Sequence, residues 1–405
     1  MTPTELLARI DEAACLGFLS RMVQHRSYSQ TEGERQLAAF MMEQMRGLGL
    51  EAELSPVGDE NRVNAIGRLR GTGGGRSLLF NGHVDTNPVT EGWTVDPWAG
   101  TIDERFIYGI GVSNMKAGDA AYFCAVRTLI EAGVRLKGDV ILTYVVGELQ
   151  GGVGTLALLK GGLRADYFIN AEPTDLQALT MHAAAFTFII ELVGSTRHLS
   201  KREEAVDAIA AACDLIPRLN AMTFSGAPSP EHARVNRVHV GVMNGALGRD
   251  LQEWRPPQVA DFVRIKGSGR YAPGQTEAGA LADMRAELDG LECRFPGLKA
   301  TLTPEHLTGR PIMPAFAVAR TSPIVQAVNR AYHTVCGKVQ PTGTITPPGY
   351  YGTDAGHLCQ AGMEGVVCGP GGQYNTMPDE RVDVIDFMDM VRVYALTMLE
   401  ICEVA

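Results

Sequence analysis

The first part of the chain alternates short apolar runs with segments whose apolar residues recur at helical spacing. This spacing predicts helices over residues 4–24, 31–48, 117–132 and 155–160. Apolar runs predict buried strands at 64–69, 77–80, 140–146 and 167–171. Strands that alternate with helices are typical of an α/β domain, so we expect a mostly parallel sheet with helices on both of its faces.

After Glu172 the pattern changes to longer strands and fewer helices. Strands are predicted at 186–194, 237–242 and 259–265, with helices at 203–219 and 276–291. Two helices on a small antiparallel sheet would form a separate α+β domain. A helix at 324–336, a strand at 365–368 and a helix at 384–402 then restore the first pattern. We therefore expect an α/β domain formed by residues 1–180 and 300–405, with an α+β domain inserted at 181–299.

Composition is that of a globular protein large enough for two domains. The 405 residues are 45% hydrophobic and 20% charged, and no apolar run approaches the length of about 18 residues that a membrane span needs. A net charge of −10 argues against a nucleic-acid partner. The eight cysteines form no Cys-x-x-Cys pair, which favours reduced thiols. Because the first residues do not read as a signal peptide, we expect a cytoplasmic protein without membrane contact.

Candidate chemistry begins where the strand at 77–80 ends. The segment NGHVDTNP (81–88) places His83 and Asp85 at the carboxyl end of a buried strand, where open α/β sheets carry their active sites. The segments WTVDPWAG (93–100) and YGIGVSNMK (108–116) follow. In order and spacing, these segments resemble the M20 family of di-zinc aminoacylases, deacetylases and carboxypeptidases. The resemblance implies an α/β catalytic domain with an inserted lid that also forms a homodimer.

The resemblance also implies five side-chain ligands for two divalent ions, and this sequence keeps only some of them. His83 and Glu172 match two of the ligands, while Asn114 replaces the bridging aspartate. Leu149 stands where a glutamate ligand belongs, and Thr376 where the distal histidine belongs. We therefore expect no dinuclear site.

The surviving ligands leave two alternatives open. His83, Glu172 and the amide oxygen of Asn114 could hold a single divalent ion, zinc or manganese, although a neutral amide is a poor substitute for a carboxylate. The other alternative is a site without metal. In either case Asp85 is implied as the partner that orients the His83 ring.

The resemblance assigns further roles to residues of both domains. Glu148, in the segment GELQGG (147–152), is implied as the general base. His198 is implied as the group that reaches across a dimer to stabilise an oxyanion. Arg310 is implied as a contact of a substrate carboxylate, and Arg270 matches another recurrent arginine of the lid. We expect both arginines, with Asn114 and Thr376, to contact the substrate. The segment Gly352–Asp354 matches a family loop near the site.

Together these features predict a hydrolase that adds water to an amide or another C–N bond of a small, carboxylate-bearing substrate. Such an enzyme would be an amidohydrolase, a deacylase or a deaminase. Two other classes stay open: a metal-free lyase or isomerase that uses Glu148 to abstract a proton, and a non-catalytic protein that binds a ligand in the same pocket. Retention of Glu148 favours an enzyme, because chemistry needs this residue more than binding does.

Overall fold

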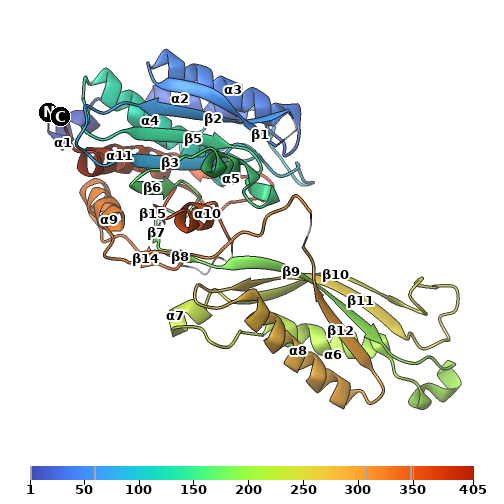
Figure 1. Ribbon diagram of the computed structural model, residues 1–405. Coiled ribbons are helices and arrows are strands. Elements are labelled where there is room, and N and C mark those ends of the chain that lie inside the picture. The colour runs from blue at the N-terminus through green and yellow to red at the C-terminus, as the bar shows by residue number, and fades with distance from the viewer. Residues whose placement is uncertain (1, 59–60, 307, 347–348, 350) are drawn as a thin grey trace. The chain divides into compact units, whose positions relative to one another are not determined.

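The computed structural model describes residues 2–58, 61–306, 308–346, 349 and 351–405. The chain forms two compact units, each with its own hydrophobic core (Figure 1). The first unit consists of Met1–Met181, Ala317–Pro347 and Thr353–Ala405, and the second of His182–Phe316 and Pro348–Gly352. The boundary expected at residue 299 falls at the start of a strand that belongs to the sheet of the second unit.

The first unit is built on an eight-stranded sheet. In spatial order its strands are β1 (Glu51–Val57), β2 (Arg62–Leu69), β5 (Val140–Val145), β3 (Leu78–His83), β6 (Tyr167–Asn170), β15 (Glu364–Val367), β7 (Ala178–Leu179) and β14 (Thr342–Gly343). The central strands β5, β3, β6 and β15 run parallel to one another. Strands β3, β5 and β6 are buried along their whole length, as is typical of parallel strands covered by helices. The predicted α/β class is confirmed.

Helices of the first unit pack on this sheet and on one another. Helix α4 packs against α2 and α11, α11 packs against α9, and α3 packs against β1 and β2. Their bounds are α2 (Glu12–Val23), α3 (Glu32–Gly47), α4 (Ala117–Glu131), α9 (Pro323–Cys336) and α11 (Val384–Ile401). The shorter helices are α5 (Val153–Lys160) and α10 (Ala355–Gln360), and β4 (Phe106–Tyr108) pairs with β16 (Arg381–Asp383).

The helix predicted over residues 4–24 is two helices in the structure. Helix α1 (Pro3–Leu7) begins after Thr2, and α2 begins after Asp11. The side chain of Asp11 accepts a hydrogen bond of 2.9 Å from the Ala14 N–H. A side chain that satisfies a free N–H in this way favours a new helix start, which is why the periodic pattern is interrupted here.

Aromatic packing fixes the strand that leads to the site. Phe80 in β3 lies between Tyr122 of α4, with ring centroids 5.4 Å apart, and Tyr394 of α11, at 5.0 Å. All three side chains are fully buried. Because β3 is held against two helices, its last residue, His83, has a fixed position.

The second unit is a four-stranded antiparallel sheet in the order β10-β11-β9-β12, packed against two helices. Its elements are β9 (Ala184–Val193), α6 (Ala208–Asn220), α7 (Pro230–Ala233), β10 (Arg237–Ala246), β11 (Phe262–Tyr271), α8 (Glu277–Arg294) and β12 (Lys299–Pro304). Helix α6 begins later than predicted because Asp207 caps it, accepting hydrogen bonds from the N–H groups of Ile209 and Ala210. Residues of β9 alternate between buried and partly buried, because one face of the sheet packs against the helices and the other does not.

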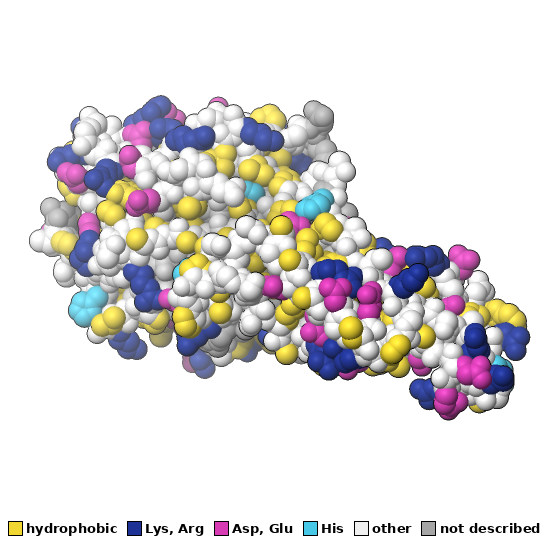
Figure 2. Space-filling view, turned by 60° about the horizontal axis from the view of Figure 1, so that its bottom comes forward, with side chains coloured by type: hydrophobic (Ala, Val, Ile, Leu, Met, Phe, Trp, Pro, Cys, Tyr) yellow, Lys and Arg dark blue, Asp and Glu magenta, His cyan; other side chains and the backbone are white. Residues whose placement is uncertain are grey.

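Acidic and basic side chains are interspersed on the face shown in Figure 2. Mixed charge of this kind does not form the single-sign surface that binds a phosphate backbone. Among the helices that the structure describes, none is both long and apolar enough to cross a membrane.

Two glycines in helices give opposite predictions for the same substitution. A Cβ atom at Gly118 in α4 would overlap the carbonyl oxygen of Ala171, whereas Gly17 in α2 has open space at that position. Gly118→Ala should therefore lower the free energy of unfolding by about 1–3 kcal/mol. Gly17→Ala should raise it by about 0.5–1 kcal/mol, because alanine loses less entropy in a helix. Denaturant unfolding of both variants measures the difference, and equal effects would contradict the packing described here.

Candidate functional site

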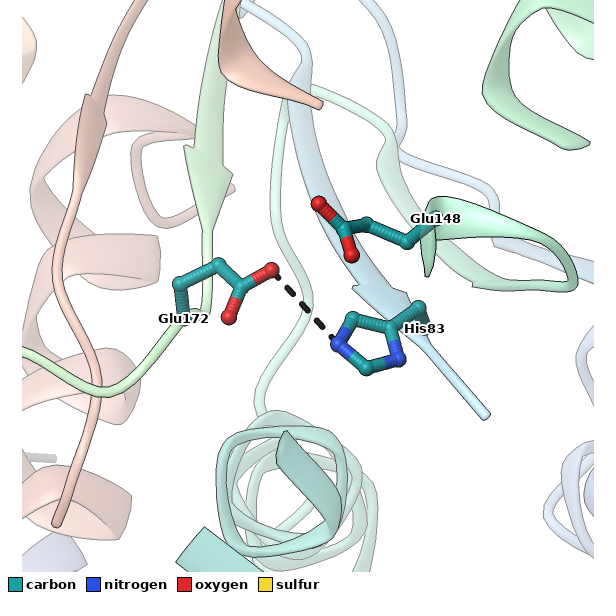
Figure 3. Close-up of side chains that lie close together, drawn as sticks. All are labelled: His83, Glu148 and Glu172. Carbon is teal, nitrogen blue, oxygen red and sulfur yellow. Dashed lines mark ion pairs between the residues drawn. The ribbon is translucent and has the colours of Figure 1, made fainter. Parts of the chain in front are cut away.

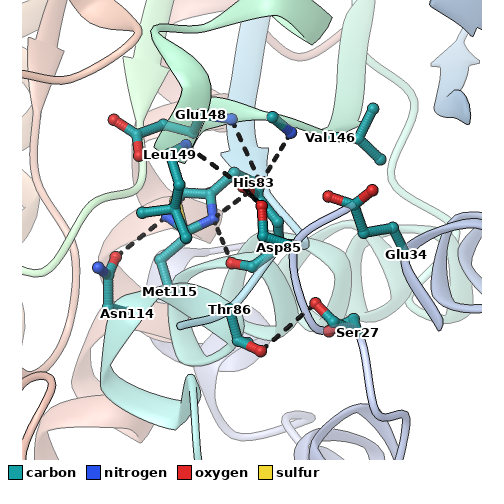
Figure 4. Close-up of polar contacts among 12 residues, drawn as sticks. Ser27, Glu34, His83, Asp85, Thr86, Asn114, Met115, Val146, Glu148 and Leu149 are labelled. Carbon is teal, nitrogen blue, oxygen red and sulfur yellow. Dashed lines mark hydrogen bonds and ion pairs between the residues drawn. The ribbon is translucent and has the colours of Figure 1, made fainter. Parts of the chain in front are cut away.

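His83 is the last residue of β3, and its buried ring faces oxygen atoms on both sides (Figure 4). Nδ1 lies 2.9 Å from the backbone oxygen of Asp85 and 3.5 Å from its carboxylate. Nε2 lies 3.1 Å from Oδ1 of Asn114 and 3.6 Å from Oε1 of Glu172. Burial lowers the pKa of His83, but the charges of Glu172 and Asp85 outweigh it and hold this pKa well above its usual value. The surroundings therefore favour an imidazolium that donates from both nitrogens.

Asp85 ties the end of β3 to the turn that follows β5. Its fully buried carboxylate accepts hydrogen bonds from the backbone N–H groups of Gly147 at 3.0 Å, Glu148 at 3.3 Å and Leu149 at 3.2 Å. Burial raises the pKa of Asp85, but hydrogen bonds from His83 and from this turn bring it below its usual value. Asp85 is thus ionised and holds both the His83 ring and the backbone of Glu148.

Glu148 and Glu172 complete a buried cluster with His83 (Figure 3). Glu148 opens the short helix η2 (Glu148–Gln150) after Gly147, whose φ of 76° requires the left-handed region that glycine favours. Glu172 follows β6, and one ligand atom from each of the three side chains lies within 4.8 Å of the others. The cluster therefore stands at the carboxyl ends of β3, β5 and β6, as the sequence predicts for an open parallel sheet.

Burial raises the pKa values of both carboxyl groups in this cluster. For Glu148 burial and the negative charge of Glu172 raise the pKa well above its usual value, although His83 opposes them. For Glu172 burial raises the pKa to about 7, again against the effect of His83. A raised pKa makes a carboxylate a stronger base once it has lost its proton.

Asn114 reaches His83 from the irregular turn η1 (Val112–Lys116), which is held by a residue far along the chain. The carboxylate of Glu380 accepts hydrogen bonds from the backbone N–H groups of Gly111 at 3.2 Å, Ser113 at 2.9 Å and Asn114 at 3.0 Å. Burial raises the pKa of Glu380 to about 7, against the effect of these hydrogen bonds. The sequence analysis gives Glu380 no role, although Glu380 ends the segment 369–380 that begins with Gly-Pro-Gly-Gly and contains Thr376.

Asp354 is a further buried acid beside the cluster. One of its oxygens accepts a hydrogen bond of 2.6 Å from Oγ1 of Thr155, and the other has no hydrogen-bond partner among the described residues. Its negative charge contributes to the raised pKa values of Glu148 and Glu172. The expectation that the segment ending at Asp354 lies near the site therefore agrees with the structure.

Leu149 and Thr376 stand at two positions where the family resemblance implies metal ligands. The backbone N–H of Leu149 binds Asp85, but its hydrocarbon side chain offers no atom to a metal ion. Thr376 is exposed and has a φ of 52°, a left-handed conformation that is rare for a β-branched residue. The structure thus brings together His83, Asp85, Asn114, Glu148 and Glu172.

The other predicted residues belong to the second unit. His198 is exposed just before η3 (Leu199–Glu204), with Nδ1 3.0 Å from the hydroxyl of Ser200. Arg270 in β11 donates a hydrogen bond of 3.0 Å to the backbone oxygen of Gly269, and Arg310 is exposed. Their contacts with a substrate stay predictions.

The cluster has the donor types and spacing that one metal ion could use. His83, Glu148 and Glu172 are the only such group of three found among the described residues. Two donors bound to one tetrahedral zinc ion, with bonds of about 2.0–2.1 Å, lie about 3.4 Å apart. Nε2 of His83 and Oε1 of Glu172 are 3.6 Å apart, so only a small movement would let both bind the same ion.

The first unit is therefore an α/β domain with a buried histidine–carboxylate centre at the carboxyl ends of its parallel strands, the place where such domains carry active sites. Residues 79–400 match the family model of peptidase family M20/M25/M40. The chain belongs to this family, and the resemblance seen in the sequence is confirmed.

Named relatives are similar over most of the chain. The N-formyl-4-amino-5-aminomethyl-2-methylpyrimidine deformylase of Bacillus subtilis is 27% identical over 358 residues, which cover 82% of this chain and 81% of that protein. The acetylornithine deacetylase of Erwinia tasmaniensis is 27% identical over 342 residues, covering 84% and 83%.

Solved structures of the family share the fold. The aminopeptidase PepT from Bacillus cereus superposes with a TM-score of 0.76 at 20% identity, covering 98% of this chain and 100% of that one. A dinuclear metal binding peptidase of the M20 family from Bacillus subtilis has a TM-score of 0.66 at 17% identity, covering 97% and 100%.

We predict that Glu148 titrates above the range of an ordinary glutamate in metal-free protein, because burial and the charge of Glu172 both oppose its ionisation. Glu148 then keeps its proton at pH values where exposed glutamates have lost theirs. Glu172→Gln removes the largest of the charge effects that raise the pKa of Glu148 and should therefore lower this pKa. Infrared difference spectra between wild type and Glu148→Gln, recorded across pH, follow the protonated carboxyl group. An ordinary titration in the wild type would contradict this prediction.

Proposed function

We propose that this protein adds water to an amide or another C–N bond of a small, carboxylate-bearing substrate, with Glu148 as general base. The observation that carries the proposal is the buried Glu148 carboxyl group, whose raised pKa suits proton transfer and whose backbone is fixed by Asp85. Two relatives that are similar over about four fifths of the chain are named a deformylase and a deacetylase, and both names describe removal of an acyl group.

In this mechanism each residue of the cluster has a separate role. Glu148 takes a proton from the attacking water and later returns it to the leaving nitrogen. The positive charge of His83 lies beside Glu172 and so limits the repulsion that Glu172 exerts on Glu148. The amide of Asn114, held through its backbone by Glu380, contacts His83 and is available to the substrate.

We further propose that the site works without a bridged pair of metal ions. Asn114 offers a neutral amide oxygen where the family resemblance implies the bridging carboxylate, Leu149 offers no donor, and Thr376 offers only a hydroxyl group. These substitutions remove the charge and the ligands that a second ion needs. A single zinc or manganese ion fits His83 and Glu172, and when bound it would supply positive charge to polarise the substrate.

The remaining roles complete the proposal. His198 would donate a hydrogen bond to the oxyanion that forms when water attacks, reaching the site of a partner chain in a homodimer. Arg270 and Arg310 would bind the carboxylate of the substrate, since guanidinium groups match carboxylates in shape and charge. With Asn114 and Thr376 they would select a small anionic substrate.

Elemental analysis of the purified protein tests the metal proposal. We expect fewer than two divalent ions per chain, because the bridging position is Asn114 and two further ligand positions are Leu149 and Thr376. The triple variant Asn114→Asp/Leu149→Glu/Thr376→His restores the family pattern and should bind more metal than the wild type. Two stoichiometric ions in the wild type would refute the proposal.

Glu148→Gln should lower kcat by about a hundredfold or more while leaving substrate affinity nearly unchanged, because general-base catalysis contributes at least that much. Glu104→Gln is the matched control, since Glu104 is exposed and should turn over normally. Reaction in oxygen-18 water should place the label in the product. Unlabelled product would indicate the lyase or isomerase, and binding without turnover in the wild type would indicate a ligand-binding protein.

Mixing His198→Ala and Glu148→Gln chains tests the shared site. If His198 serves the partner's pocket, each mixed dimer has one complete site, and free exchange of chains should restore about a quarter of wild-type activity. Neither variant should be active alone. No recovery after exchange, verified with differently tagged chains, would contradict the role of His198.

A further inference from the structure

A cavity of about 240 Å³ lies in the first unit beside the loops that carry the cluster. Its walls are mostly apolar and include Pro88, Trp93, Ile110 and Met377, and Thr376 also lines it. None of the described residues that line the cavity is basic, and one of them is the acid Glu380. A concave apolar surface with few polar groups is typical of a small-molecule subsite.

The cavity walls continue the segments that form the catalytic site. Pro88 stands in the loop that follows His83 and Asp85, and Ile110 directly precedes the turn that carries Asn114. Met377 stands in the segment that ends in Glu380. Because the same loops form both features, a molecule whose reacting bond lies at the cluster can extend into the cavity.

Two adjacent acids hold these walls in place. Asp379 accepts hydrogen bonds from the backbone N–H of Thr94 at 2.8 Å and from its hydroxyl at 2.6 Å. Glu380 accepts hydrogen bonds from Ser113 and Asn114. The loop at Thr94 and the turn at Asn114 are therefore both fixed to the segment that carries Met377, and the cavity exists before a ligand enters.

We propose that this cavity is the subsite for a neutral apolar group of the substrate, a single aromatic ring or a branched alkyl chain. This inference rests on the proposed hydrolysis and names the class of its substrate. A cavity of about 150 Å³ in another protein is large enough to bind benzene, so about 240 Å³ accommodates a ring with a short linker. The substrate carboxylate binds elsewhere, because no basic side chain among the described lining residues could pair with it here.

Thr376 explains how a relative of metal-dependent enzymes gains this space. The family resemblance places a metal-ligating histidine at this position, and threonine is the smaller side chain. The exchange that removes a ligand therefore also removes bulk from the cavity wall. Loss of the metal ligand and room for a larger apolar group are two consequences of one substitution.

Two tryptophan substitutions at similarly exposed positions test the subsite. Met377 is 42% exposed and lines the cavity, whereas Val89 is 44% exposed and does not line it. Met377→Trp should fill the cavity and Val89→Trp should leave it open. The substrate panel places the apolar group on either side of the amide: N-formylalanine against N-formylphenylalanine, and N-acetylglycine against N-benzoylglycine.

In the wild type, the aromatic member of at least one pair should have a KM at least about tenfold lower than its partner, the scale of selectivity that apolar pockets provide. Met377→Trp should abolish this difference with little change for the smaller substrate, and Val89→Trp should preserve it. An absent preference in the wild type, or a preference that survives Met377→Trp, overturns the inference.

If the wild type hydrolyses no member of the panel, the proposed hydrolysis fails for these substrates and the subsite is judged by binding alone. Crystals of wild type and Met377→Trp are then soaked in toluene and, separately, in benzoate. Toluene in the wild-type cavity, with benzoate excluded and Met377→Trp empty, supports the inference. An empty wild-type cavity, or equal occupancy by benzoate, overturns it.

Discussion

The site depends on the buried carboxylate of Asp85. A buried charge without partners costs several kcal/mol, and a hydrogen bond to a charged group contributes about 1.5–3 kcal/mol. Asp85 meets this requirement with three backbone N–H groups from the turn after β5 and with the ring of His83 at the end of β3. The same contacts that stabilise its charge therefore set the position of Glu148 relative to the imidazole. Two strand ends far apart in sequence become one site.

Negative charge is the second constraint on this centre. Glu148, Glu172 and Asp354 are buried near one another, and His83 is the main positive neighbour of the two glutamates only, so ionisation of all three acids is unfavourable. Protons, one cation or a polar substrate can relieve this repulsion. In the family pattern two cations balance the carboxylates, whereas here Asn114 and Leu149 remove two carboxylates. A site with fewer negative charges needs fewer cations to neutralise it. The proposal of at most one metal ion follows from this charge balance.

The sequence predicted what local signals encode. Apolar runs located β3, β5 and β6, the end of β3 located His83, and the family resemblance located Glu148 and Glu172. It missed β1 and β12, in which exposed residues alternate with partly buried ones and leave no apolar run. It also missed the role of Glu380, because that carboxylate acts on the backbone of Asn114 from 266 residues away, and a hydrogen bond to a backbone N–H requires no particular partner side chain. The cavity could not be predicted from the sequence either, because three loops that are far apart along the chain form it.

The segment from Gly369 to Glu380 shows why ligands can be lost without loss of the fold. Asp379 and Glu380 fix it to the loops at Thr94 and Asn114 through hydrogen bonds of 2.6–3.0 Å, and none of these bonds involves the side chain of Thr376. The backbone at Thr376 adopts an unfavourable φ of 52°, a cost that its neighbours' hydrogen bonds must offset. Because these bonds hold the loop in place, a metal ion is not needed to hold it. The family resemblance implies a histidine ligand where Thr376 stands, and these hydrogen bonds explain how the framework keeps its form with threonine at this position.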